Sequence, residues 1–574
     1  MAHTSHQRST FVYLLQLTLS LFLTCCGNLQ AQVHFNWALS QGSNASDFIN
    51  GALADDQGHL YTLLTISDTA DLDPGPGTEL FIPWDKETAV LSKWSDAGEY
   101  IWSAAFQTKG ETGGYMLQAK DNKLFIEIYY TDTLTYVLQG QQTLLSTNSG
   151  EHVAILTLDL DGQVLSIHDL QPSFNMYLSY FNITSSGDYL IGGAFSDSIV
   201  FSTLSGDTTL HANSSDGIIA SFHQDWTLNW LQTFSSDDDD YISNLYTANG
   251  RIYYSAGHAD TITIQTTNGP MIYSAVNGDN AIFGTMSQEG QILTSQSFGG
   301  SKDDDEIESI TADQEGNMYV CGYFEGEVNF QHPDEQPVYY TSTNSSEGFV
   351  SKYNSSGRLQ WTRIVRNSEY GGMHSVILHR NENLYIIGGY NGHTDLDPGP
   401  DSIIVETPNW GDIYGMKLDK EGNLKWVYNF TGPDLEGITT QIISPEARIY
   451  YSGFAYDVLD GDPGPDEFLI PNRGGTDLFL ISLTEENVIT ANAEPDPYRM
   501  SLYPNPASDE VFVQGESPIE NIIVYSPDGK FEAVQTEIRI DSARLETSGL
   551  KPGMYSIQVK TSDAFHTLKF LKIE

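Results

Sequence analysis

The sequence repeats one six-residue phrase in which two aspartates stand two positions apart. It reads DLDPGP at residues 71–76 and 395–400, and DGDPGP at residues 460–465. Residues two apart on an extended chain point the same way, so the paired carboxylates could clamp a hard cation such as calcium. This hypothesis assigns a metal to Asp71 with Asp73, Asp395 with Asp397, and Asp460 with Asp462.

The same phrase also has a purely structural interpretation. Asp-Pro-Gly places Asp first in a tight turn, Pro second with its φ preset, and Gly where a positive φ is needed. The phrase is not an EF-hand, because its fifth and sixth positions are Gly and Pro, and only Glu406 is a glutamate at a twelfth position. A plain turn and a calcium loop are both open at this point.

A second set of acids recurs at steps of 64 or 65 residues and predicts an acidic rim on one face of the fold. Carboxylates in such a rim favour cations or neutral polymers as ligands. Asn175 fills the one place in the series that is not acidic. The acidic rim consists of Asp47, Glu111, Asp239, Asp304, Glu369 and Asp434.

No motif for nucleophilic catalysis, phosphate binding or zinc occurs in the sequence, so no catalytic residue is assigned. Paired carboxylates could serve as the acid and base of a glycan hydrolase. An active site could also involve the histidines, which are His258, His374, His379 and His393. Cys321 stands alone in an apolar strand pattern and is expected to be a small buried filler.

These residues must be positioned by many short strands. Residues 302–365 hold four β-branched and aromatic runs separated by turns rich in Gly, Asn, Ser and Asp. Four antiparallel strands repeated seven times are the signature of a β-propeller. The aromatic residue of the second run recurs at steps of 64 to 66, as Tyr61, Phe125, Tyr189, Tyr253, Tyr319, Tyr385 and Tyr450.

A tryptophan marks the fourth strand of the repeat. It occurs as Trp102, Trp230, Trp361 and Trp426, and an eighth copy of the pattern, Phe35 to Leu39, lies 65 residues before Trp102. We predict that this N-terminal strand completes the last blade and closes the ring. The DLDPGP phrase then lies between the second and third strands of blades one, six and seven, on the same face as the acidic rim.

The repeats resemble the bacterial β-propeller repeats called SBBP. The matching features are the Gly-Gly-Ser and Asp-Asp opening, the Gly-Asn-Met-Tyr-Val centre and the Ser-Gly-to-Trp ending of residues 299–361. The resemblance implies a seven-bladed propeller over residues 32–490. It implies no activity, since propellers host many functions.

After a linker at residues 491–500, the tail resembles the C-terminal sorting domain of type IX secretion substrates. An alternating, turn-bounded pattern over residues 501–574 predicts a small Ig-like β-sandwich. The resemblance implies export across an outer membrane by the type IX secretion machinery, usually followed by removal of the tail and release or attachment to surface lipopolysaccharide. It is carried by the sorting residues Tyr503, Pro504, Asn505, Pro506, Gly553 and Tyr555.

The N-terminus is typical of a secretory signal. Arg8 precedes an apolar run from Phe11 to Leu23, and cleavage is expected between Ala31 and Gln32, so that residues 1–31 are removed. Cys25 and Cys26 offer a lipoprotein alternative, which Thr24 before Cys25 disfavours. The apolar run is too short to span a bilayer, so no transmembrane segment is expected in the mature chain.

The composition restricts the partners of the mature protein. The chain of 574 residues has 26 basic and 76 acidic side chains and a net charge of −50, which excludes nucleic acid and anionic lipid as partners. We expect a surface or extracellular module that binds a polymer, a glycan or a protein without catalysis. The alternative is a secreted glycan hydrolase or lyase with its site on the acidic face.

Overall fold

The computed structural model describes residues 33–485 and 501–572, except for short gaps. The chain divides into two compact units, Met1–Glu486 and Asn487–Glu574. Every element of the described residues is a β-strand, which confirms the all-β class. Within that part of the chain, no helix is long and apolar enough to cross a membrane. The gaps are residues 85–86, 148–150, 171–175, 204–205, 276–279, 301–304, 333, 408–410, 445–446, 465, 504–506, 515–517, 527–530, 533, 540–541 and 562–564.

Several expectations from the sequence therefore lie outside the described residues. They are the signal peptide with its cleavage between Ala31 and Gln32, the linker at 491–500, and the residues Asp304, Pro504, Asn505 and Pro506.

In its described residues, the first unit contains seven main sheets, each built on four antiparallel strands, which we number one to seven in chain order. In three of them a hairpin adds two more strands, and two short hairpins form sheets of their own. Sheet one comprises β2 (Phe48–Ala54), β3 (Leu60–Ile66), β6 (Thr88–Trp94) and β7 (Tyr100–Gln107), and sheet two comprises β8 (Thr112–Lys120), β9 (Lys123–Thr131), β12 (Glu151–Asp159) and β13 (Val164–Leu170). Sheet three comprises β14 (Met176–Ile183), β15 (Tyr189–Thr203), β16 (Gly206–Phe222) and β17 (Leu228–Phe234), and sheet four comprises β18 (Asp240–Ala248), β19 (Arg251–His258), β22 (Asn280–Ser287) and β23 (Ile292–Phe298).

The remaining three sheets follow the same order, except that the last takes its fourth strand from the other end of the unit. Sheet five comprises β24 (Glu306–Ala312), β25 (Met318–Asn329), β26 (Tyr339–Tyr353) and β27 (Leu359–Asn367). Sheet six comprises β28 (Gly371–His379), β29 (Asn383–Tyr390), β32 (Asp412–Asp419) and β33 (Leu424–Phe430). Sheet seven comprises β34 (Glu436–Ile443), β35 (Arg448–Ala455), β38 (Asp477–Glu485) and β1 (Val33–Gln41).

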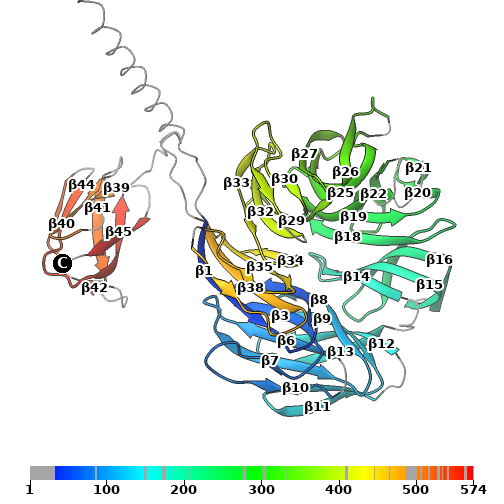
Figure 1. The fold of residues 1–574 in the computed structure, drawn as a ribbon, viewed down its shortest axis with the longest axis horizontal. Coiled ribbons are helices and arrows are strands. Elements are labelled where there is room, and N and C mark those ends of the chain that lie inside the picture. Colours follow the sequence, from blue (N-terminus) through cyan, green and yellow to red (C-terminus); the bar gives the residue numbers. More distant parts are fainter. Residues whose placement is uncertain are drawn as a thin grey trace, which may run out of the picture. The chain divides into compact units, whose positions relative to one another are not determined.

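The seven sheets are arranged in a closed ring around a common centre (Figure 1). The first strand of each sheet contacts the first strand of the next, and β34 of the last sheet contacts β2 of the first. Each first strand carries a β-bulge at an equivalent place, such as Ile49/Gly51 in β2 and Ile438/Thr440 in β34. The apolar core lies between neighbouring sheets, where Tyr61 of sheet one packs with Leu156 of sheet two.

The ring closes through the N-terminal strand, as the sequence predicts. β1 pairs antiparallel with β38, with Leu39 opposite Leu480. Asn36 reinforces this pairing by donating from Nδ2 to Ser482 Oγ at 3.2 Å and to Thr484 Oγ1 at 2.8 Å. This strand covers an edge of β38 that would otherwise be open to pairing with another chain.

Several long connections between second and third strands form hairpins that lie on the outermost strand of the preceding sheet, and we call these clasp hairpins. The hairpin of residues 262–273 in sheet four pairs instead with β23 of its own sheet. The hairpin of sheet six consists of β30 (His393–Asp395) and β31 (Ile404–Glu406), which pair with each other. β30 also pairs with β27 of sheet five, where Asp395 lies opposite Arg366. In sheet two, β10 (Leu134–Leu138) pairs with β7 and with β11 (Gln141–Ser146). Clasp hairpins thus protect sheet edges.

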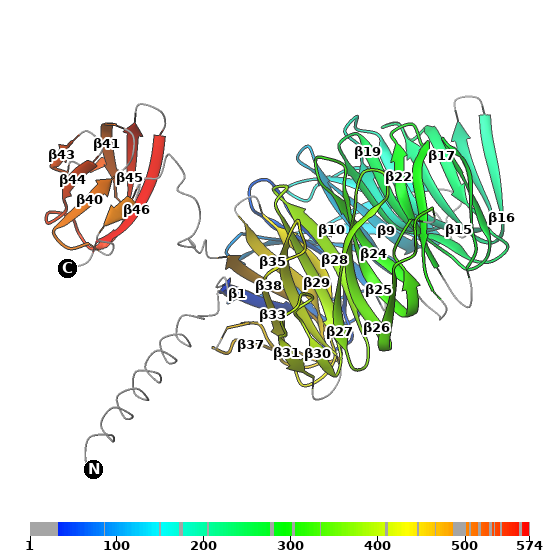
Figure 2. The same cartoon turned by 90° about the horizontal axis from the view of Figure 1, so that it is seen from above.

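The other clasp hairpins are shorter or more loosely joined. In sheet seven, Asp460 N donates to Thr431 O at 3.3 Å, next to β33, and in sheet one Leu72 O accepts a bond of 2.9 Å from Gln41 Nε2 of β1. The hairpins of sheets six and seven lie along one edge of the ring (Figure 2). The remaining strands are β4 (Ala70–Asp71), β5 (Leu80–Phe81), β20 (Ile262–Thr266), β21 (Gly269–Tyr273), β36 (Leu459–Asp460) and β37 (Leu469–Ile470).

The fourth-strand tryptophans other than Trp426 pack on a glycine in a tight turn of the next sheet. Trp230 donates its indole N–H to Gln288 O at 2.8 Å, and its ring covers Gly290, whose φ is +81°. A Cβ atom on Gly290 would lie 2.5 Å from that ring. The same contact joins Trp37 to Gly98, Trp102 to Gly162, and Trp361 to Gly422.

We expect Gly290→Ala to lower the free energy of unfolding by about 2 kcal/mol or more, because it adds a clash with Trp230 to the strain of a positive φ. Urea unfolding followed by tryptophan emission measures this, since all nine tryptophans lie before residue 486. The control is Gly250→Ala, which has a φ of +70° and no atom near its Cβ position, and should cost about 1 kcal/mol. Equal losses for the two variants would contradict the packing argument.

The second unit has two four-stranded antiparallel sheets around one core. Val511 and Leu545 from one sheet pack with Val524, Ile557 and Val559 from the other. The first sheet comprises β39 (Ser501–Tyr503), β40 (Glu510–Gln514), β44 (Ser542–Glu546) and β43 (Thr536–Ile538), and the second β42 (Phe531–Glu532), β41 (Ile519–Tyr525), β45 (Gly553–Thr561) and β46 (Phe565–Lys572).

Candidate functional site

All three copies of the DLDPGP phrase form the same hydrogen-bonded turn. In the second copy, Asp395 Oδ1 accepts from Asp397 N at 3.1 Å and from Ile403 N at 2.9 Å, and Asp397 Oδ1 accepts from Gly399 N at 2.7 Å. The phrase therefore forms a turn, but aspartate side chains hold it, and the positive φ expected at its glycine is not found at Gly75, Gly399 or Gly464. The corresponding donors are the N–H groups of Asp73, Glu79 and Gly75 in the first copy, and of Asp462, Phe468 and Gly464 in the third.

These bonds limit what the paired aspartates offer to a metal. In each copy both Oδ1 atoms already accept main-chain bonds, so one oxygen of each aspartate is left for a ligand. A calcium ion takes six to eight oxygens, and the others would have to come from water or from a bound polymer. In the described part of the chain, no group of three or more His, Cys, Asp or Glu side chains is placed to hold a metal ion. Calcium stays a prediction.

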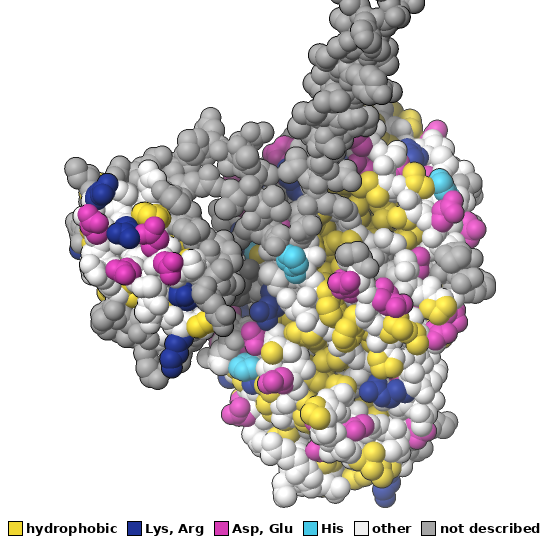
Figure 3. Space-filling view, turned by 60° about the vertical axis from the view of Figure 1, so that its left-hand side comes forward, with side chains coloured by type: hydrophobic (Ala, Val, Ile, Leu, Met, Phe, Trp, Pro, Cys, Tyr) yellow, Lys and Arg dark blue, Asp and Glu magenta, His cyan; other side chains and the backbone are white. Residues whose placement is uncertain are grey.

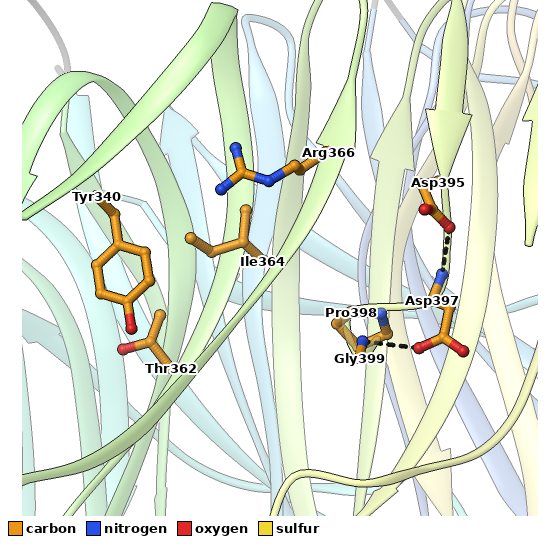
Figure 4. Close-up of a pocket in the computed structure, with 8 residues that line it drawn as sticks. All are labelled: Tyr340, Thr362, Ile364, Arg366, Asp395, Asp397, Pro398 and Gly399. Carbon is orange, nitrogen blue, oxygen red and sulfur yellow. Dashed lines mark hydrogen bonds between the residues drawn. The ribbon is translucent and has the colours of Figure 1, made fainter. Parts of the chain in front are cut away.

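The second copy borders a pocket, which lies between sheet five and the clasp hairpin of sheet six (Figure 4). The pocket has a volume of about 190 Å³. One wall is the DLDPGP turn, and the opposite wall comes from β26 and β27. The lining residues are Tyr340, Thr362, Ile364, Arg366, Asp395, Asp397, Pro398 and Gly399.

Arg366 supplies the positive charge of the pocket and is held by a buried carboxylate. Its Nη1 donates to both oxygens of Glu347, at 3.3 and 3.0 Å. The Glu347 side chain is only 1% exposed and also accepts from Thr343 N at 3.0 Å and Thr343 Oγ1 at 2.8 Å. This charge-assisted network fixes the guanidinium at the pocket wall and neutralises it.

The rest of the wall that carries Arg366 is aromatic and apolar. Tyr340 stands edge-on to Phe330, with ring centroids 5.2 Å apart, and this contact braces its ring. Ile364 and Thr362 complete the wall, and Thr362 Oγ1 lies 2.9 Å from Ser351 Oγ. The pocket therefore combines an apolar ring, a fixed cation and two fixed carboxylates, the few convergent polar groups typical of small-molecule sites.

Sequence reasoning named the two aspartates of this pocket and missed Arg366, Glu347 and Tyr340. A signal existed, because the repeat places Thr431 of sheet six where sheet five has Arg366. A residue that breaks the repeat at one position is a better pointer to a site than a phrase that occurs three times. Comparison of the repeats position by position would have found it.

The expected acidic rim is only partly a surface feature. Asp47 is 2% exposed, and its carboxylate accepts from the N–H groups of Ser43 and Ser67, which ties the loop before β2 to the end of β3. This bond places the two connections at one end of the sheet, as predicted. Glu111, Asp239 and Glu369 are exposed, and Asp434 is partly buried.

The bulges show which acids are the true equivalents of Asp47. The position that Asp47 occupies relative to the bulge of β2 is occupied by Asp240, Asp305 and Glu436 relative to the bulges of β18, β24 and β34. These acids lie one or two residues after the acids that the spacing of the repeat selected. All three are buried. Spacing alone could not resolve this offset, because runs such as residues 237–240 offer several adjacent acids.

Buried acids also face one another across three boundaries between sheets. Asp412 of β32 lies beside Glu436 of β34. Burial, and to a smaller extent the charge of Asp412, raises the pKa of Glu436 to about 8. Burial raises the pKa of Asp412 to about 6. The other two pairs are Asp216 with Asp240, and Asp477 with Asp47.

The four histidines do not form a common site. His374 Nδ1 lies 3.8 Å from Glu308 Oε1, His393 Nδ1 lies 3.0 Å from Glu406 Oε1, and His258 Nδ1 lies 2.7 Å from Asp260 O. His379 packs edge-on against Tyr385. Cys321 is fully buried, as expected, and burial raises the pKa of its thiol.

The second unit matches a known family. Residues 501–573 match the family model described as the secretion system C-terminal sorting domain. The protein is exported. The sorting domain makes the type IX secretion machinery its export partner, and it places the protein outside the cell or on the cell surface.

The match covers all the residues that suggested the sorting domain from sequence. Of these, Tyr503 lies in β39, and Gly553 and Tyr555 lie in β45. Tyr555 is buried and donates from its hydroxyl to Lys551 O at 3.0 Å, which fixes the turn that enters β45.

The comparisons say less about the first unit. A stretch of 130 residues is 28% identical to an uncharacterized WD repeat-containing protein, L264, from Acanthamoeba polyphaga mimivirus. That stretch is 21% of this chain and 9% of the viral protein, so the chain spans under a tenth of that relative. Among solved structures, the phage phi92 endosialidase aligns over 93% of this chain and 87% of its own, with 9% identity and a TM-score of 0.29. A score this low does not establish a common fold.

Proposed function

We propose that the protein is an exported, non-catalytic binding or adhesion module that holds a glycan polymer at its first unit. In this proposal the seven sheets are the blades of a seven-bladed β-propeller built from SBBP-type repeats, and the sorting domain is an Ig-like sandwich that delivers it. The ring of sheets, its closure by β1 and the sorting-domain match support this assignment.

The observation that carries the proposal is the pocket beside Arg366. Its polar groups are fixed by other protein groups, Arg366 by Glu347 and the two aspartates by main-chain N–H groups. Groups held in this way are suited to recognise hydroxyls, because little ordering remains to be done on binding. Large hydrophobic side chains, such as Leu80, Ile82 and Trp84, are also exposed on the hairpin of sheet one. Figure 3 shows one face of the molecule on which hydrophobic side chains gather.

The alternative is a glycan hydrolase or lyase. Asp412 and Glu436 have the separated pKa values that acid–base pairs use. They are 1% and 3% exposed, so a polymer cannot reach them in this conformation. The partly buried carboxylates of the pocket, in contrast, each use one oxygen to hold a turn. Binding is therefore the better supported function.

A retention assay on the exported mature chain tests the proposal. We expect the chain to be retained on immobilised polysaccharide and to generate no new reducing or unsaturated chain ends. New ends would overturn the non-catalytic function. Running the assay in calcium and again in EDTA tests the metal hypothesis, because a calcium loop predicts that EDTA abolishes retention.

A further inference from the structure

The pocket beside Arg366 is the place where one junction of the ring departs from its equivalents. Its wall uses β26 and β27, with Arg366 on β27 and the aromatic ring of Tyr340 near the start of β26. The equivalent hairpin of sheet seven has the same turn but faces Thr431 in place of Arg366. A ligand specific for this junction must therefore use Arg366 or Tyr340 together with Asp397.

The charge of the pocket excludes anionic ligands. Glu347 neutralises Arg366, so the two aspartates give the pocket a net negative charge in a chain of net charge −50. An anionic polymer would be repelled. A hard cation would find one oxygen on each aspartate without a main-chain bond, so it would need further oxygens from water or from a bound polymer.

The remaining groups fit a ligand whose hydroxyls both donate and accept. The bonds of Arg366 within the described residues all start from Nη1, so its Nη2 and Nε hydrogens can donate to a ligand. The second oxygens of Asp395 and Asp397 can accept. Figure 4 shows Asp395 and Asp397 on one side of the pocket, and Arg366 on the other side with Tyr340.

The volume of the pocket and its apolar wall restrict the class of ligand further. A volume of about 190 Å³ is below the range of sites for drug-sized molecules, so one ring-sized unit fits at a time. Tyr340 and Ile364 give that unit an apolar wall, which suits the C–H face of a pyranose ring. Because the pocket opens at the rim of the ring, the neighbouring units of a chain can continue outside it.

We propose that this pocket is a subsite for one neutral hexose unit of a polysaccharide, with Asp397 and Arg366 binding adjacent hydroxyls and Tyr340 packing on the sugar ring. This inference rests on the proposed binding function and names its ligand class. Asp397 accepts from the sugar through Oδ2, while its Oδ1 continues to hold Gly399 N.

The test compares two aspartates that differ only in their surroundings. Asp397→Asn keeps the turn but replaces the free acceptor oxygen by a donor, and Asp462→Asn makes the same change in the third copy of the phrase. The exported mature chain is measured by affinity electrophoresis in gels containing laminarin, mannan or amylose as neutral hexose polymers. Alginate serves as the anionic polymer and chitosan as the cationic one.

We expect retention on at least one neutral polymer, at least about a tenfold loss of affinity for Asp397→Asn, and a change of less than about twofold for Asp462→Asn. Tyr340→Leu should weaken retention similarly, while Tyr339→Leu, at an adjacent residue that is 58% exposed and does not line the pocket, should not. Unchanged thermal unfolding of each variant by tryptophan emission shows that the fold is intact.

The other outcomes separate this inference from the proposed function. Equal effects of Asp397→Asn and Asp462→Asn, with the wild type retained, overturn the subsite but leave the binding module. Retention on alginate or chitosan alone overturns the neutral-hexose class and leaves binding intact. A wild type that no polymer retains overturns both.

Discussion

Raising the pH from about 5 to about 8 should lower the melting temperature of the seven-sheet unit by about 5 °C or more. Burial keeps the pKa values of several carboxyls above their ordinary range: Asp477 and Asp412 at about 6, Asp240 at about 7, and Glu436 and Glu127 at about 8. As the pH rises past 4 to 5, the unfolded chain loses these protons while the folded chain retains them. Folding stability is therefore full at low pH and declines as the pH rises through the folded-state values.

One substitution isolates the largest of these contributions at a sheet boundary. Glu436→Gln mimics the protonated side chain, so it should match the wild type near pH 5 and exceed it near pH 8 by about 1–3 kcal/mol. The control is Glu406→Gln, in which the replaced side chain is 76% exposed, and it should follow the wild-type pH profile. Thermal unfolding by tryptophan emission reads only the first unit, which holds all nine tryptophans. A wild type whose stability is flat or rises between pH 5 and 8 would contradict the buried-carboxyl argument.

The same acids show how far sequence reasoning reaches. The period of 64 to 66 residues, the turn residues and the tryptophans determine where strands begin and end, because these features depend on local backbone geometry. They located the second-strand tyrosines, the fourth-strand tryptophans and the closure by β1. The sorting domain was also recognisable, since its motifs lie close together in the chain.

What could not be predicted depends on contacts between sheets. Whether Asp239 or Asp240 is the buried acid depends on a bulge in β18, and a one-residue slip moves a side chain to the other face. The pocket needs Arg366, Glu347 and a clasp hairpin that arrives from the next sheet. No local pattern indicates that residues 340 and 397 face each other, because the repeat says which residues are equivalent and not which ones meet.

Deleting residues 33–41 should destabilise the first unit more than any point substitution considered above, because it opens the ring. The deletion removes β1 from the edge of β38 and with it the contact of Trp37 with Gly98 and the bond from Gln41 to Leu72 O. It also removes the Ser40 oxygens that Arg473 Nη1 bonds at 3.1 and 3.0 Å. We expect the melting temperature to fall by about 10 °C or more and the protein to self-associate through the exposed edge.

Addition of the missing strand separates loss of closure from a general defect. A synthetic peptide of residues 33–41 should restore the melting temperature of the truncated chain and reverse its association, because donated strands pair with open sheet edges. A scrambled peptide of the same composition should do neither. If the truncated chain has the same melting temperature as the wild type, the ring is stable without β1, and the eighth copy of the tryptophan pattern has another purpose. If the native peptide rescues and the scrambled one does not, closure of the ring by its own N-terminus is what holds the seven sheets, and the pocket between sheets five and six, in place.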